Sequence, residues 1–213
     1  YMHRGNFSEA STLLGAVVNG AAAAGISLES DFANVVTDGS SEILFATVLS
    51  TSITNAGGST TTFVGWFSGA DTKGDEDPVT LGLIAAFDAS SAAGGGTDLR
   101  KALTIDEANR KGAKYTGGLD QDFIELRLTD VILMYAEALN ETGSPATTVL
   151  PLLDPIRTRA GLNSLTGTIS SQADVRQAIA DERRVELAFE GHRWFDLVRT
   201  GTVDAAMAQT VNS

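Results

Sequence analysis

The residues most able to do chemistry are concentrated near the carboxyl end, in the run from Asp181 to Arg199. Glutamates recur there at every fourth residue, a spacing that places them on one face of a helix. Neighbouring carboxyl groups can serve as an acid and a base in hydrolysis, or cations can hold them as a structural lattice. The charged side chains of interest are Glu182, Arg183, Glu186, Glu190, Arg193, Asp196 and Arg199.

The matching of opposite charges favours the structural role. Arg193, Asp196 and Arg199 are expected on a following helix, from which they could return to pair with the glutamates. Pairing with a cation lowers the pKa of a carboxyl group, whereas a general acid needs a raised pKa. We therefore interpret the group as an ion-pair lattice that locks two helices, and we expect no catalytic residue in the chain.

Signatures of other chemical sites are missing. His3 and His192 are the two histidines, and neither belongs to a His-Glu-x-x-His motif. Cysteine is absent, no Gly-x-Ser-x-Gly turn occurs, and glycines 94–96 lack the Lys-Ser/Thr ending of a phosphate loop. We expect no metal site and no cofactor. A glycosidase pair of carboxylates that meet across the fold stays open, because sequence spacing cannot reveal it.

The aromatic residues of a loop-like stretch are the better candidates for ligand binding. The sequence between positions 50 and 78 is rich in Gly, Ser, Thr and Asp, yet it carries three aromatic side chains. Exposed rings can pack against sugar rings, and nearby carboxylates can accept hydroxyl hydrogen bonds. Alternatively, the rings fold back onto the helices as a satellite core. The candidate residues are Phe63, Trp66, Phe67, Asp71 and Asp75.

The composition limits the partners. The 213 residues include 27 acidic and 15 basic side chains, which give a formal net charge of −12. This charge repels phosphate backbones, so nucleic acid is excluded as a partner. An apolar share of 43% is sufficient for a core. No stretch approaches the roughly 20 apolar residues of a membrane span.

Helices must position most of these residues. Apolar periodicity, capping residues and glycine stops predict helices over 6–24, 79–87, 127–143, 171–191 and 192–199, another that ends at Ala160, an extended segment over 42–49 and a flexible loop over 92–96. Ser171 and Asp174 form a capping box. Trp194 is expected in the core, within the charged lattice.

Two prolines leave the helix that ends at Ala160 with alternative starts. Pro151 and Pro155 would each remove a hydrogen bond from a helix that contains both. Asp154 could instead cap a short helix that begins at Pro155.

Three blocks of sequence resemble one known family. The run from Glu182 to Gly201 closely resembles the carboxyl-terminal signature of the SusD/RagB family of nutrient-binding outer-membrane lipoproteins. The blocks 126–141 and 156–162 agree in the same order, and 5–10 and 41–45 resemble further family segments. The resemblance therefore spans nearly the whole chain.

The resemblance implies a mainly α fold, SusD-like, with tetratricopeptide-like helix pairs, loop-rich segments and minor β structure. We expect residues 1–213 to be a fragment of a single SusD-like domain whose native chain extends upstream. Its expected parts are a helix-pair remnant (1–36), a loop-rich, ligand-facing segment (37–120) and the helical signature region (121–201).

The resemblance also implies a function and partners. It indicates a surface lipoprotein of the outer membrane that captures oligosaccharide and delivers it to a SusC-like TonB-dependent barrel. The membrane attachment would be an amino-terminal lipid anchor that this piece lacks. An alternative is a protein-interaction lid that binds peptides or other nutrients instead of glycan.

Overall fold

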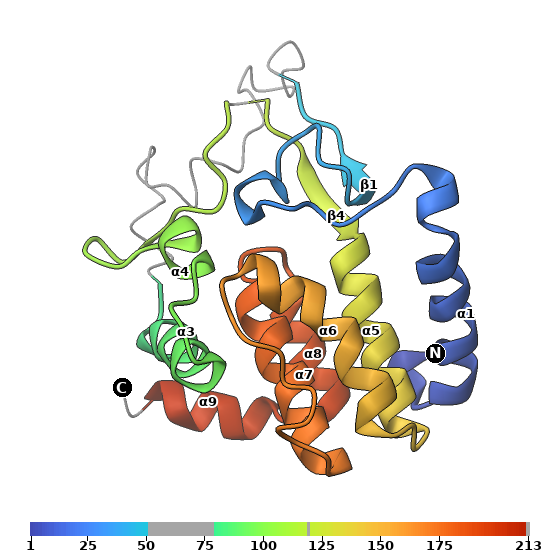
Figure 1. The fold of residues 1–213 in the computed structure, drawn as a ribbon. Coiled ribbons are helices and arrows are strands. Elements are labelled where there is room, and N and C mark those ends of the chain that lie inside the picture. Colours follow the sequence, from blue (N-terminus) through green and yellow to red (C-terminus); the bar gives the residue numbers. More distant parts are fainter. Residues whose placement is uncertain (51–78, 119, 212–213) are drawn as a thin grey trace.

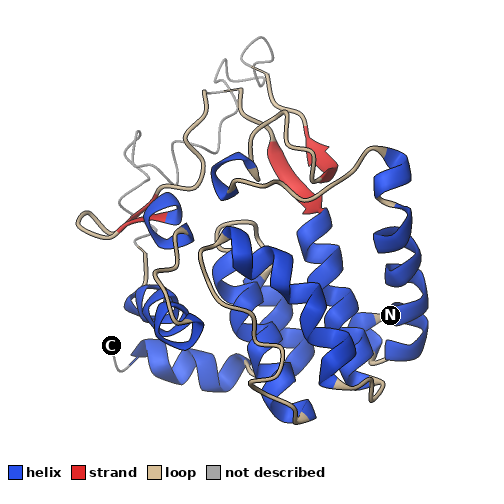
Figure 2. Ribbon diagram, in the orientation of Figure 1, coloured by secondary structure: helices blue, strands red, loops and turns tan. Residues whose placement is uncertain are grey.

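The computed structural model describes residues 1–50, 79–118 and 120–211, and the fold is mainly α-helical, as the sequence predicts (Figure 1, Figure 2). The helices are α1 (Phe7–Gly20), α3 (Leu81–Gly94), α4 (Arg100–Thr104), α5 (Leu128–Glu141), α6 (Ala146–Arg159), α7 (Gln172–Glu186), α8 (Arg193–Thr200) and α9 (Val203–Val211), with 3-10 turns at Met2–Arg4, Ala22–Ala24 and Phe32–Asn34. The strands are β1 (Ile43–Thr47), β2 (Ile105–Asp106), β3 (Lys111–Gly112) and β4 (Phe123–Arg127). None of the described helices is both long and apolar enough to cross a membrane.

Helices α5 and α7 form the centre of the molecule. Helix α1 packs on α5, α3 packs on α7, and α6 contacts both central helices (Figure 1). The main core lies among α5, α6 and α7, where Leu133, Leu153 and Ile179 are buried. Their apolar positions recur every three or four residues, so each helix presents one apolar stripe to the others.

A short antiparallel ribbon covers one end of the helical layer. Strand β1 pairs with β4, with Ile43 opposite Arg127 and Thr47 opposite Phe123. Phe32, Val35 and Ile124 form a second apolar cluster against this ribbon. The pairing brings Glu42, immediately before β1, close to the start of α5, where the Leu128 N–H donates to the Glu42 carbonyl at 2.9 Å.

The predicted starts of α1 and α7 are confirmed by their caps. The Asn6 side chain accepts the Glu9 N–H at the start of α1, and the Ser171 hydroxyl oxygen accepts the Asp174 N–H at 3.1 Å at the start of α7. These contacts satisfy backbone donors that have no partner inside a helix. The predicted stop at Gly25 follows a 3-10 turn, and its φ of 76° is a conformation that glycine adopts readily.

The predicted ends of three helices are wrong. Helix α1 ends at Gly20, and the residues just before Gly25 form a separate 3-10 turn. Helix α3 continues through Ala92 and Ala93 to Gly94, where a flexible loop was expected, because alanine favours the helix and Gly95 provides the stop. Helix α7 ends at Glu186 and not at Gly191. Its chain turns at Phe189, which has a φ of 66° that is rare for a bulky side chain. The Phe189 ring packs against two apolar clusters, and this burial offsets the backbone strain.

Both prolines lie inside one continuous helix, so the short alternative that starts at Pro155 is wrong. Helix α6 begins at Ala146, and its buried face carries Val149, Leu150, Leu153 and Ile156. The prolines lie on the opposite, exposed face. Water can hydrate the carbonyls that lose their partners there, while packing of the buried face holds the helix together.

We predict that Pro151→Ala stabilises the protein. The substitution restores the missing N–H in the interior of α6 and should raise the free energy of unfolding by about 1–3 kcal/mol in urea titrations. Pro145→Ala is the matched control, because Pro145 precedes the first helical residue and removes no helical hydrogen bond. An equal gain in both variants would contradict this account of α6.

Candidate functional site

The glutamates predicted to form a lattice lie in a buried ion-pair network. Glu186 is at its centre. Its Oε1 accepts from Arg127 at 3.0 Å and from Arg159 at 2.5 Å, and its Oε2 accepts from Arg100 at 2.8 Å. These cations come from β4, α6 and α4, so one carboxylate joins three elements to α7.

Two further glutamates extend the network toward the ribbon. Glu190 accepts from Lys114 at 2.5 Å and from Arg127 Nε at 2.7 Å. Glu42 accepts from Arg127 Nη1 at 2.8 Å, and it also pairs with Arg159. The turn at Phe189 directs the Glu190 carboxylate to this position. The strained backbone of Phe189 therefore allows Glu190 to join the network.

The network is balanced in charge and closed to solvent. None of its side chains is more than 6% exposed. A buried charge without a partner is costly, so opposite charges must be buried together. Its members are the carboxylates Glu42, Asp98, Glu182, Glu186 and Glu190 and the cations Arg100, Lys114, Arg127, Arg157 and Arg159.

The electrostatics of this network oppose acid catalysis. Burial by itself would raise the pKa of Glu190, but Arg127 and Lys114 outweigh it and lower the pKa to about 2. Glu186 likewise has a pKa well below its usual range, because Arg159, Arg127 and Arg100 outweigh the effect of burial. A general acid at neutral pH needs the opposite shift. The arrangement is suited to holding segments together.

The partners of the glutamates differ from those expected. Helix α8 supplies none of the cations that pair with Glu182, Glu186 or Glu190. Sequence reasoning missed the actual partners because they lie 25 to 86 residues away. A signal was available, since Arg127, Arg157 and Arg159 fall within the blocks that resemble the family.

Helix α8 has its own set of ion pairs. Asp196 accepts from Arg183 at 2.9 Å and from Arg199 at 2.8 Å, which joins α8 to α7. Arg183 also pairs with Asp130 at 2.7 Å, and Arg199 pairs with Glu137, so both arginines reach α5. The two helices predicted to be joined by charge are therefore joined through Asp196.

Trp194 does not lie in the core, so that expectation is wrong. Its side chain is 57% exposed, and Phe195 is 59% exposed. Leu197 is the buried side chain of α8, while Asp196 and Arg199 point to the same side to make their ion pairs. In a helix of eight residues, this arrangement turns Trp194, Phe195 and Val198 outward.

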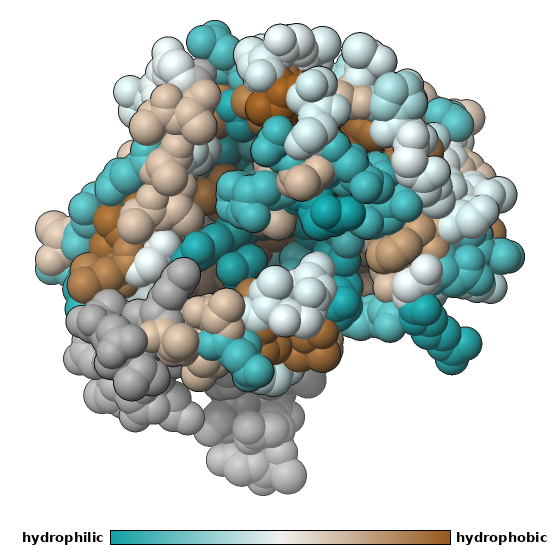
Figure 3. All heavy atoms as spheres, turned by 90° about the horizontal axis from the view of Figure 1, so that it is seen from below, coloured by the Kyte–Doolittle hydropathy of each residue, from teal (hydrophilic) through white to brown (hydrophobic). Residues whose placement is uncertain are grey.

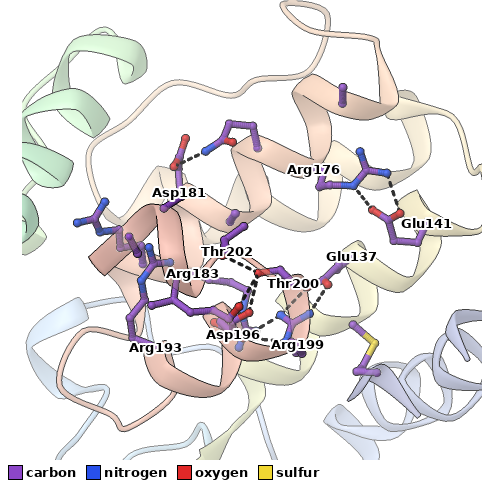
Figure 4. A pocket seen from close by; sticks show the side chains of 18 of the residues that line it. Glu137, Glu141, Arg176, Asp181, Arg183, Arg193, Asp196, Arg199, Thr200 and Thr202 are labelled. Atoms are coloured by element: carbon purple, nitrogen blue, oxygen red, sulfur yellow. Dashed lines mark hydrogen bonds and ion pairs between the residues drawn. The ribbon is translucent and has the colours of Figure 1, made fainter. Parts of the chain in front are cut away.

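A groove with a volume of about 620 Å³ lies beside this second set of ion pairs. Helices α5, α7, α8 and α9 provide most of its walls (Figure 4). In the close view, Arg176 and Glu141 lie toward one end, and Asp181 and Arg193 lie toward the other. The hydroxyls of Thr200 and Thr202, 2.8 Å apart, also face it.

The underside of the molecule is mixed in character. In the view of Figure 3, hydrophilic side chains gather over the middle of the underside, and hydrophobic ones lie in separate patches nearer its edge. A groove rich in charged and hydroxyl groups can recognise a polar ligand by hydrogen bonds.

The aromatic candidates lie outside the described residues. Phe63, Trp66, Phe67, Asp71 and Asp75 belong to residues 51–78. Their role in ligand binding stays a prediction.

Comparison with known proteins identifies related sequences. The model of the SusD family matches residues 90–212. The SusD-like protein P38 of Formosa agariphila is 40% identical over 88 residues, which cover 38% of this chain and 17% of P38. SusD-like protein P2 of the same organism is 35% identical over 86 residues, which cover 37% of this chain and 17% of P2.

Solved structures extend the similarity over the whole chain. A SusD superfamily protein from Bacteroides vulgatus matches with a TM-score of 0.76 at 20% identity, over 99% of this chain and 51% of that protein. A laminarin-binding SusD-like protein matches with a TM-score of 0.61 at 28% identity, over 99% of this chain and 54% of that protein. This chain thus spans about half the length of the solved relatives.

We predict that Glu186→Gln is strongly destabilising. Loss of the charge leaves three buried arginines with too little compensation and should lower the free energy of unfolding by about 3–5 kcal/mol in urea titrations. Glu141→Gln is the matched control, because its partner Arg176 is 49% exposed and such pairs contribute about 0–1 kcal/mol. Similar losses in both variants would contradict a special role for the buried network.

We also predict that acid weakens the fold through Glu190. Its pKa is about 2 in the folded chain and near 4.5 when unperturbed, so folding favours the deprotonated form. The stabilisation is complete above pH 4.5 and is lost as the pH falls toward 2. Urea titrations across this range should show a smaller pH dependence for Glu190→Gln than for the wild type. Equal dependence in both proteins would exclude Glu190 as a source.

Proposed function

We propose that this chain, which belongs to the SusD family, captures glycan at the cell surface and delivers it to a SusC-like TonB-dependent transporter. The observation that carries the proposal is the similarity to the laminarin-binding SusD-like protein, which extends over 99% of this chain. A surface glycan-binding protein A from Bacteroides uniformis matches with a TM-score of 0.61 at 20% identity, over 95% of this chain and 47% of that protein.

The described part of the structure supports binding without chemistry. The buried carboxylates of Glu186 and Glu190 have lowered pKa values, so they are unsuited to donate a proton at neutral pH. The groove beside α8 offers charged and hydroxyl groups that can bind a polar ligand. In this proposal the protein is an outward-facing lipoprotein of the outer membrane, and it hydrolyses nothing.

One observation favours a second function. Trp194, Phe195 and Val198 form an exposed apolar face on α8, of a kind that is common in protein interfaces. The alternative is therefore an interaction module that binds peptide or another protein in place of glycan. Glycan binding by the isolated chain distinguishes the two functions.

We predict that Trp66→Ala weakens glycan binding. Stacking of a sugar ring on an aromatic face contributes to affinity, so loss of the indole should reduce the retardation of this chain in an affinity gel that contains laminarin. Trp194→Ala is the matched control, because it removes an exposed indole from a different element. The same samples should release no reducing sugar.

The outcomes of this experiment distinguish between the two candidate binding sites and test for catalysis. Equal retardation of wild type and Trp66→Ala would move the binding site away from that residue. Selective loss in Trp194→Ala would favour the exposed face of α8. Release of reducing sugar would contradict the absence of catalysis.

A further inference from the structure

Two arginines that line the groove beside α8 lack the carboxylate partners that its other arginines have. Arg176, Arg183 and Arg199 line the groove and are all ion-paired. Arg184 and Arg193 also line it. Arg184 donates to the Gly82 carbonyl at 2.9 Å, which is a neutral partner. Across the described ranges, neither Arg184 nor Arg193 forms an ion pair with a carboxylate.

The nearby carboxylates are already engaged elsewhere. Asp196 accepts from both Arg183 and Arg199, and Asp181 accepts from the Gln177 amide at 2.9 Å. The negative charges of Asp196 and Asp181 favour the charged form of Arg193 without a direct ion pair. Partial burial and the neighbouring guanidinium of Arg184 oppose it and lower the pKa of Arg193. The two cations thus lie close enough to repel each other, although the whole chain carries a net charge of −12.

An anion placed between two guanidinium groups would remove this repulsion. Guanidinium groups bind carboxylates through charge-assisted, often paired hydrogen bonds, which are stronger than hydrogen bonds between neutral groups. Arg184 comes from the last turns of α7 and Arg193 from the first residue of α8, so two elements fix their positions. Arg193 is labelled at one end of the groove in Figure 4.

The rest of the groove offers a sugar chain both polar and apolar contacts. Its volume of about 620 Å³ falls within the range of small-ligand sites. Thr200 and Thr202 offer hydroxyls, and Gln177 offers an amide. Ala173, Ala180 and Ala205, which also line the groove, are small enough to leave room for rings.

We propose that Arg184 and Arg193 bind the carboxylate of an acidic saccharide whose neighbouring sugar rings occupy this groove. The inference rests on the proposed function and adds that glycans containing uronic acid bind this groove more tightly than neutral glycans do. The recognition is electrostatic at one end of the groove and depends on hydroxyl hydrogen bonds along the remainder.

The test is calorimetric titration of the 213-residue chain with oligogalacturonate and with the methyl ester of the same oligosaccharide. Esterification removes the negative charge and keeps the sugar backbone. Arg184→Gln and Arg193→Gln should each weaken oligogalacturonate binding about tenfold, since each removes a charge-assisted hydrogen bond. The effect should shrink at high salt. Arg176→Gln is the matched control, because Arg176 lines the same groove but is paired with Glu141. Circular dichroism verifies that each variant is folded.

Four outcomes would overturn the inference. They are absence of oligogalacturonate binding, equal affinity for the ester, an equal loss in Arg176→Gln, and equally tight binding of a polyglutamate peptide. A parallel titration with neutral laminarin oligosaccharides separates the two proposals. Binding of the neutral glycan without a preference for the acid would remove this inference and leave the proposed function standing. Absence of binding to every glycan would remove both.

Discussion

The carboxylate of Glu186 can be buried only because arginines from three other elements reach it. Arg100 begins α4, Arg127 ends β4, and Arg159 ends α6. A buried carboxylate that lost these partners would be destabilised by several kcal/mol. The helices and the ribbon can therefore assemble only in the arrangement that brings all three guanidinium groups to one point. The apolar clusters supply much of the driving force for folding. The need to pair Glu186 with its three arginines determines how the elements pack against one another.

A centre in which every buried charge meets an opposite charge leaves ligand recognition to the periphery. The buried carboxylates bind arginines and have lowered pKa values, so they are not available to a substrate. The groove beside α8 is different, because Arg184 and Arg193 face it without carboxylate partners among the described residues. An arginine that meets a buried glutamate thus holds the fold, whereas an arginine without a carboxylate partner is available to an anionic ligand.

Local signals in the sequence predict helix positions well and helix ends less well. The cap at Ser171 and the glycine stops were sufficient because each acts within one turn of helix. The premature end of α7 was not predictable, since it depends on burial of the Phe189 ring in apolar clusters formed by distant segments. The continuity of α6 through Pro151 and Pro155 has the same origin, because tertiary packing of the opposite face outweighs the local cost of each proline.

The sequence by itself determined the helical class, the main helix starts, the acidic character and the resemblance to the SusD/RagB family. Periodicity, caps and motifs depend only on the order of residues, and the acidic character depends only on their composition. Only the tertiary structure decided which charges meet. Glu42 and Arg127 are 85 residues apart, and the antiparallel pairing of β1 with β4 brings them together. It also decided that Trp194 faces outward, since Asp196 and Leu197 already occupy the inner side of α8. Helical spacing reports on neighbours three or four residues away, whereas ion pairing depends on distance in space.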